Sequence, residues 1–103
     1  MIELTDFLKD RHMITNLNLR RNKITNLGAL SLIDWMLLHD NSLTSMDVSR
    51  NKITRAGAQA FLTALKKLIR ITEFQITYGN PIPLEVNLAI QSEIMANNQI
   101  KQN

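Results

Sequence analysis

The order of apolar and polar positions in residues 14–36 recurs in residues 43–65, with a constant offset of 29 residues. In both copies a short alternation of apolar and polar residues is followed by apolar residues spaced by three and four. The alternation predicts a half-buried strand, and the wider spacing predicts one face of a helix. We therefore expect one strand and one helix in each unit. The matched positions are Leu17, Leu19, Asn22, Ile24, Gly28, Ala29, Leu32, Ile33 and Met36 with Met46, Val48, Asn51, Ile53, Gly57, Ala58, Phe61, Leu62 and Leu65.

The segments on either side continue the pattern in incomplete form. Residues 71–76 repeat the strand spacing after 28 residues, and residues 79–82 correspond to residues 50–53 after one inserted residue. Residues 1–10 carry the apolar spacing of the helix of an earlier unit. We expect a single domain, residues 1–103, divided into a partial unit (1–13), repeat 1 (14–42), repeat 2 (43–70) and a degenerate repeat 3 with a C-terminal cap (71–103).

Threonine and proline residues mark where the helices are expected to begin. Thr25 and Thr54 precede the first two helices and are suited to cap them. Pro81 and Pro83 delay the third helix, so that it begins near Leu84 or Glu85. On that helix we expect four apolar residues to face the core and four polar residues to face water. The apolar set is Leu88, Ile90, Ile94 and Met95, and the polar set is Glu85, Asn87, Gln91 and Glu93.

One strand and one helix cannot bury their apolar faces alone, so the units are expected to stack. Stacking predicts an α/β solenoid, a short horseshoe with parallel strands on the concave face and helices on the convex face. The pattern LxxLxLxxNxI…GAxxLxxxL, from Ile14 to Ile82, resembles the leucine-rich repeat of the ribonuclease-inhibitor type. The ending FQITYGNPIPLEVNLAIQSEIMANNQI also resembles the C-terminal capping unit of the tropomodulin and leiomodin leucine-rich-repeat domain, in which a last strand precedes a helix that ends in paired asparagines.

Asn22 and Asn51 follow the strands at the same place in their units. A buried amide at a sharp turn between strand and helix can hydrogen-bond backbone groups that the turn otherwise leaves unpaired. We therefore assign both asparagines a structural role rather than a ligand-binding or metal-binding one.

Composition limits the classes of function. The chain carries a net charge of +3, and its lysines and arginines are dispersed rather than clustered with aromatic residues. It has no cysteine, which excludes disulfides and thiolate metal sites and favours a reducing compartment. No apolar run is long enough to span a bilayer, and the first residues do not resemble a signal peptide. We expect a soluble cytoplasmic protein without a membrane partner.

The sequence offers no candidate catalytic residues. His12 and His39 occupy different places in the repeat, so no metal site or general-base pair is expected from them. Asp34, Asp40 and Asp47 fall on a helix, a loop and a strand. The turn at residues 79–81 lacks the glycine and lysine spacing of a phosphate loop. We expect neither an enzyme nor a bound cofactor.

Strand positions that alternate with the apolar residues point out of the sheet and are candidates for partner binding. Arg21, Arg50 and Tyr78 form one row across the units, where two guanidinium groups beside an aromatic ring suit a carboxylate or a phosphate. The alternative is that these residues are only solvated and that an arginine pairs with Asp47 within the sheet. The expected binding residues of this face are Asn18, Arg20, Arg21, Asp47, Ser49, Arg50, Gln75, Thr77 and Tyr78.

The first helix is apolar at positions where the second is polar. Four of its residues align with Gln59, Ala64, Lys66 and Lys67 of the second helix, and they are Leu30, Trp35, Leu37 and Leu38. We expect these four to form a second binding surface, with the alternative that Trp35 fills the space between helices. The first strand also leaves an unpaired sheet edge, where self-association or stacking is a further option.

These features favour a non-catalytic module that binds another protein, as an adaptor or as a peripheral subunit of a larger intracellular assembly. The tropomodulin-like ending implies a cytoskeletal or ciliary setting. The alternative from another class is a nucleic-acid-associated module, which would contact phosphates through Arg20, Arg21, Arg50, Arg55 and Arg70.

Overall fold

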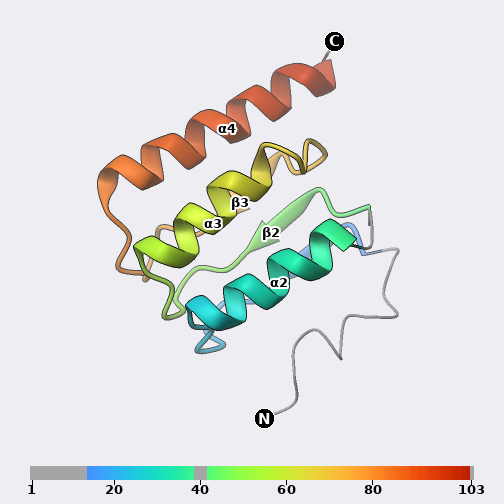
Figure 1. Ribbon diagram of the computed structural model, residues 1–103. Helices are drawn as coiled ribbons and strands as arrows, with labels where there is room; N and C mark the ends of the chain where they lie inside the picture. The colour runs from blue at the N-terminus through green and yellow to red at the C-terminus, as the bar shows by residue number, and fades with distance from the viewer. Residues whose placement is uncertain (1–13, 39–41, 103) are drawn as a thin grey trace.

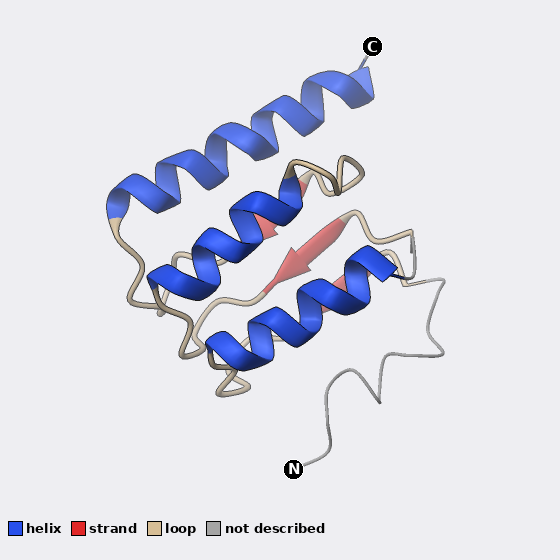
Figure 2. Cartoon of the chain, in the orientation of Figure 1, coloured by secondary structure: helices blue, strands red, loops and turns tan. Residues whose placement is uncertain are grey.

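The computed structural model of the protein describes residues 14–38 and 42–102. Three strands and three helices alternate in this part of the chain (Figures 1 and 2). They are β1 (Asn16–Asn18), α2 (Asn26–Leu38), β2 (Ser45–Asp47), α3 (Arg55–Leu65), β3 (Glu73–Gln75) and α4 (Leu84–Gln102). The helix that the sequence predicts within residues 1–10 lies outside the described residues.

The strands of the described chain form one parallel sheet in the order β1, β2, β3. Asn16 of β1 is in register with Ser45 of β2, and Ser45 is in register with Glu73 of β3. This register confirms the offsets of 29 and 28 residues between the units. No described strand pairs with the other edge of β1, so the predicted open sheet edge is present in this part of the chain.

The helices form a second layer that covers one face of the sheet (Figures 1 and 2). They lie in chain order, with α3 packed against both α2 and α4. Met46 and Phe74, the central residues of β2 and β3, are buried beneath the helices. The ring of Phe61 from α3 packs on the ring of Phe74, with their centroids 5.0 Å apart. The core therefore lies between the two layers, as the alternating pattern of each unit predicts.

Asn51 joins the first two units through its side chain, at the turn after β2. Its Oδ1 accepts hydrogen bonds from the backbone N–H groups of Asn22 and Ile24, each at 2.9 Å. Its Nδ2 donates to the carbonyl oxygens of Leu19, Val48 and Ser49. The side chain is buried and satisfies backbone groups of its own turn and of the preceding turn, which is the structural role that the sequence predicts.

Asn80 repeats this arrangement one unit later. Its Oδ1 accepts from the backbone N–H groups of Asn51 and Ile53, and its Nδ2 donates to the carbonyl oxygens of Val48 and Ile76. The inserted residue before Asn80 therefore preserves the position of its amide. Each of these two buried asparagines therefore bonds backbone groups of the unit that precedes its own.

The prediction of a buried role for Asn22 was wrong. The side chain of Asn22 is exposed, and its Nδ2 donates only to the nearby carbonyl oxygen of Arg20 at 2.9 Å. The physical reason is the direction of the ladder: an asparagine bonds the turn of the unit before it, and Asn22 belongs to the first described unit. Its backbone still takes part in the ladder, because its N–H donates to Asn51.

The start of α3 is capped by a side chain of the preceding helix rather than by Thr54. Oδ1 of Asn26 accepts from the backbone N–H groups of Thr54 and Gly57, and its Nδ2 donates to Oγ1 of Thr54. The Thr54 side chain makes no capping hydrogen bond, and Thr25 accepts only a long 3.5 Å contact from Gly28. The capping prediction for Thr54 is therefore wrong, because a neighbouring repeat supplies the oxygen that the helix terminus needs.

Helix α4 begins at Leu84, as the two prolines predict. Ile90 and Ile94 are buried as expected, but Leu88 and Met95 are 58% and 65% exposed. Val86 and Asn97, which the sequence does not assign to the core, are also buried. The prediction for Leu88 and Met95 was wrong because α4 packs through one narrow face, and an apolar residue does not reveal from sequence which side of a helix has a neighbour.

The paired asparagines near the end of α4 tie this helix to the loop that precedes β3. Nδ2 of Asn97 donates to the carbonyl oxygens of Leu68 and Ile71. Nδ2 of Asn98 donates to the carbonyl oxygens of Thr72 and Ile94. Three of these four bonds pair carbonyl groups of the connection between α3 and β3, and the fourth, to Ile94, lies within α4.

Candidate binding surfaces

The face of the sheet opposite the helices carries polar side chains in rows. Asn18 is in register with Asp47, and Asp47 is in register with Gln75. Asn18, Gln75 and the following Thr77 are exposed, while Asp47 is partly buried. The hydroxyl group of Thr77 also donates to Oδ1 of Asn87 in α4. The sequence therefore places these residues on the correct face, and this open face is available to a partner.

Ser49 and Asp47 are bonded to each other rather than free. Oδ1 of Asp47 accepts from the backbone N–H and the hydroxyl group of Ser49, at 2.9 and 2.6 Å. Oδ2 of Asp47 lies 3.8 Å from Nε of Arg20, which is the internal ion pair that the sequence allows as an alternative. Ser49 is only 3% exposed, so its expected contact with a partner is wrong: the hydroxyl group serves to hold the carboxylate.

Arg21, Arg50 and Tyr78 lie in one row just beyond the carboxyl ends of the strands. The backbone N–H of Arg21 donates to the carbonyl oxygen of Ser49, and that of Arg50 donates to the carbonyl oxygen of Tyr78 at 2.7 Å. Nη2 of Arg50 donates to the hydroxyl oxygen of Tyr78, and its Cζ lies 4.6 Å from the centroid of the ring. Two of the three predicted residues, Arg50 and Tyr78, are therefore in direct contact.

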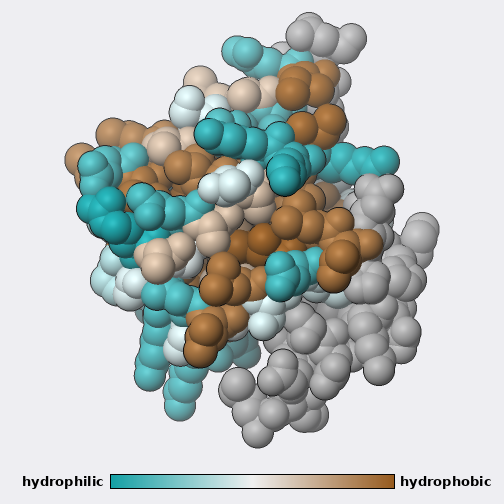
Figure 3. Space-filling view, viewed as in Figure 1, coloured by the Kyte–Doolittle hydropathy of each residue, from teal (hydrophilic) through white to brown (hydrophobic). Residues whose placement is uncertain are grey.

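The outer side of α2 forms a second exposed surface, which we call the α2 leucine surface. Hydrophobic residues run along α2 in the space-filling view (Figure 3). This surface comprises Leu27, Leu30, Leu37 and Leu38, of which Leu27 and Leu38 are 78% and 79% exposed. Trp35 is only 2% exposed and belongs to the core. Its predicted place on the binding surface was therefore wrong, and the alternative, that Trp35 fills space inside the protein, is correct. The sequence comparison of the two helices missed Leu27, whose counterpart Ala56 is also apolar.

A comparison with known protein families bears on this geometry. Residues 12–32 and 39–62 match a family model described as Leucine Rich repeat. These matches support a leucine-rich repeat protein. The matched segments contain β1 and the first part of α2, and then β2 and most of α3, while β3 and α4 lie outside them. A comparison with curated proteins gave no match. Leucine-rich repeat domains generally mediate binding between proteins and are typically non-catalytic.

The last helix of the chain also exposes apolar side chains. Leu84, Leu88 and Met95 of α4 are all exposed, and their spacing of four and seven residues places them on one side of the helix. The exposed side of α4 is thus less polar than a helix surface that contacts only water. The sequence pattern assigns Leu88 and Met95 of this stripe to the core.

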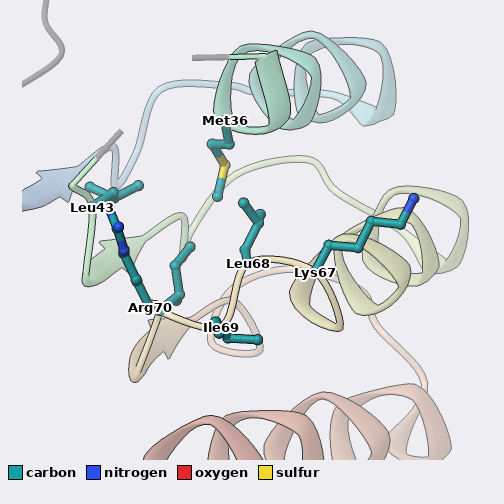
Figure 4. Close-up of a pocket in the computed structure, with 7 residues that line it drawn as sticks. Met36, Leu43, Lys67, Leu68, Ile69 and Arg70 are labelled. Atoms are coloured by element: carbon teal, nitrogen blue, oxygen red, sulfur yellow. The ribbon is translucent and has the colours of Figure 1, made fainter. Parts of the chain in front are cut away.

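A groove of about 280 Å³ lies between the end of α2 and the segment that follows α3. It is lined by Met36, Leu43, Lys67, Leu68, Ile69, Arg70 and Ile71. Figure 4 shows Met36 and Leu68 pointing toward each other across it, while the side chain of Lys67 points away. The groove is therefore mainly apolar, and it combines no set of groups suited to catalysis.

The arginines named in the sequence do not form one patch. Arg20, Arg21 and Arg50 follow the carboxyl ends of β1 and β2, whereas Arg70 lies in the connection that enters β3 from the opposite end. Arg55, at the start of α3, forms an ion pair with Glu85 of α4. His12, His39 and Asp40 lie outside the described residues. None of the described helices is both long and apolar enough to cross a membrane.

Proposed function

We propose that this leucine-rich repeat protein is a non-catalytic module that binds another protein through the open face of its sheet. The observation that carries the proposal is the row of Asn18, Asp47 and Gln75, which a hydrogen-bonded sheet holds in register over a packed core. A face fixed in this way loses little conformational entropy when a partner binds. The module would serve as an adaptor or as a peripheral subunit of a larger assembly.

The proposal extends to the shape and setting of the molecule. Repeats of the ribonuclease-inhibitor type would form a short solenoid with the open sheet face on its concave side, closed by a cap of the tropomodulin kind. The hydrogen bonds of Asn97 and Asn98 to the connection before β3 support the cap. The lack of cysteine supports a cytoplasmic location, and the resemblance of the ending supports a setting at the cytoskeleton or in a cilium.

Affinity capture followed by reconstitution with the purified partner tests this function. Gln75→Glu places a carboxylate on the open sheet face, on the edge strand β3, and Gln59→Glu makes the same change on the exposed side of α3. We expect Gln75→Glu to weaken binding of the purified partner by about tenfold or more, and Gln59→Glu by less than about twofold, measured by isothermal titration calorimetry. A partner whose affinity is unchanged by Gln75→Glu, or the failure of every captured protein to bind the purified chain, would contradict the proposal.

A further inference from the structure

The guanidinium group of Arg50 is held in place before any partner arrives. It stacks on the ring of Tyr78 and donates from Nη2 to the Tyr78 hydroxyl oxygen at 3.0 Å. The turn at Gly79 lies against the first carbon atoms of the Arg50 side chain, since a Cβ atom at position 79 would come within 2.7 Å of Cγ of Arg50. Stacking and packing together fix a side chain that is otherwise flexible, so little rotamer freedom remains to be lost on binding.

Arg50 and Tyr78 each keep one hydrogen-bond donor that is available to a partner. Nε of Arg50 is buried without a hydrogen-bond partner among the described residues, whereas Nη1 is neither buried nor bonded to a described residue. The Tyr78 hydroxyl accepts from Arg50, so its own hydrogen is free to donate. Tyr78 itself is exposed. One guanidinium nitrogen and one hydroxyl group therefore offer two adjacent donors.

The charge around this pair is not compensated. Within the described residues neither Arg21 nor Arg50 has an ion pair. The carboxylate of Asp47, on the open sheet face, already accepts from Ser49 and pairs with Arg20. A negatively charged group of a partner would therefore meet a positive potential at this end of the sheet without competition from the chain.

We infer that Arg50 and Tyr78 bind a carboxylate of an acidic peptide segment of the partner. This inference rests on the proposed function and names the chemistry of the segment that the open sheet face receives. One carboxylate oxygen accepts from the Tyr78 hydroxyl group and the other from Nη1 of Arg50, a charge-assisted pair of hydrogen bonds. Arg21, the next residue of the row, supplies a second cation for a neighbouring acidic side chain.

The rest of the face favours a peptide over a nucleic acid. Asp47 lies at the carboxyl end of the central strand β2 and Glu73 at the amino end of β3, and both repel a continuous phosphodiester backbone, which carries a charge at every nucleotide. The amide side chains of Asn18 and Gln75 flank Asp47 on the two neighbouring strands, and an amide can both donate to and accept from a peptide backbone. The remaining arginines named above are either paired or at the other end of the sheet.

The test uses nuclear magnetic resonance of the full chain and two synthetic peptides. The first is a twelve-residue serine peptide with two glutamates at its centre, and the second carries glutamine in place of both glutamates. We expect the glutamate peptide to shift the Arg50 Nε–H and Gly79 amide signals and the glutamine peptide to leave them unchanged. Tyr78→Phe, which keeps the ring but removes the donor, and Arg50→Lys, which keeps the charge but loses the fork, should each weaken binding by about fivefold or more.

Lys66→Gln is the matched control, because it removes one positive charge from the exposed end of α3, away from the row. It should change the affinity by less than about twofold. Equal shifts with both peptides, or equal losses for Lys66→Gln and Arg50→Lys, would overturn the inference. So would tighter binding at the same signals by a twelve-nucleotide oligothymidylate or by a peptide with phosphoserine in place of glutamate. A captured partner that depends on Gln75 but not on Arg50 or Tyr78 would overturn this inference and leave the proposed function intact.

Discussion

At the scale of single residues, the fold depends on carboxamide groups that serve backbone atoms of two units at once. Asn51 bonds N–H groups of the first unit with its oxygen and carbonyl groups of both units with its nitrogen. A hydroxyl or carboxylate side chain cannot replace it, because only an amide both donates twice and accepts twice from one planar group. The same residue type at position 22, in the first described unit, has no such partners and remains exposed.

Replacing these two asparagines by alanine should therefore have unequal effects. Asn51→Ala leaves the N–H groups of Asn22 and Ile24 without their acceptor, and we expect it to lower the free energy of unfolding by about 3 kcal/mol, the upper part of the usual range for unsatisfied buried groups. Asn22→Ala removes one exposed bond and should cost less than about 0.5 kcal/mol. Urea unfolding followed by circular dichroism measures both values. Equal losses would show that the ladder is not the source of the stability.

Two glycines at equivalent positions should also differ in their tolerance of alanine. A Cβ atom at Gly57 would lie 2.5 Å from Oδ1 of Asn26 and 2.8 Å from Cγ2 of Ile53, so Gly57→Ala must displace the residue that caps α3. We expect a loss of about 1–3 kcal/mol. At Gly28 the nearest atom, Cγ2 of Ile24, would be 3.1 Å away, and the helix propensity of alanine offsets the strain. Gly28→Ala should stay within about 1 kcal/mol of the parent protein in thermal unfolding.

The residue scale also shows where sequence alone falls short. The repeat pattern identifies Asn51 as structural and places Asn18 and Gln75 on the open face, because both conclusions depend only on periodicity. It fails for Ser49, whose burial depends on a bond to Asp47 within the same strand end. It fails for Trp35 as well, because a large apolar residue on an apolar helix has no polar neighbour to mark its exposed side.

At the scale of elements, the strands and helices follow from the sequence more closely than their contacts do. The start of α4 at Leu84 is set by two prolines, whose effect is local. The capping of α3 by Asn26 joins helices of different units and could not be predicted from the residues that immediately precede α3. The inward side of α4 likewise depends on the position of α3, which a single helical pattern does not contain.

The α2 leucine surface leads to a prediction about this helix. Leu37 and Leu38 are both exposed, and their counterparts in α3 are Lys66 and Lys67. The double variant Leu37→Lys, Leu38→Lys should fold with a melting temperature within a few degrees of the parent, because neither side chain is in the core. If α2 carries a partner or a second copy, the variant should lose that association, as measured by analytical ultracentrifugation and by capture of the partner. Unfolding of the variant would assign both leucines to the core and sink the idea.

At the scale of the whole molecule, the two ends of the array differ. The first unit ends in an unpaired strand edge within the described residues, and the last unit ends in α4 and its asparagines. The turn of the third unit pairs its own N–H groups. The N–H of Asn80 donates to the carbonyl oxygen of Thr77, and the N–H of Ile82 donates to the carbonyl oxygen of Asn80. The corresponding N–H groups of the earlier units instead need an asparagine from the next unit.

Removal of residues 84–103 should therefore unfold the protein. Val86, Ile90 and Ile94 of α4 are buried, and burial of three such side chains is worth about 5–9 kcal/mol. This matches the whole stability expected of a chain of this size, about 5–15 kcal/mol. We expect the truncated chain to be unfolded or aggregated by circular dichroism and size-exclusion chromatography. A soluble monomer that melts cooperatively near the parent temperature would show that α4 is dispensable and is no cap.

Because each buried asparagine accepts from N–H groups of the preceding unit, the loss of its side chain exposes amide protons of that unit. Amide protons of Asn51 and Ile53 are held by Asn80, and those of Asn22 and Ile24 are held by Asn51. In hydrogen exchange under native conditions, Asn51→Ala should speed exchange at Asn22 and Ile24 while Ile53 keeps its protection. Asn80→Ala should speed exchange at Ile53 and also upstream of it. The amide protons that a lost carboxamide exposes therefore lie in the preceding unit, so that each repeat depends for this protection on the repeat that follows it.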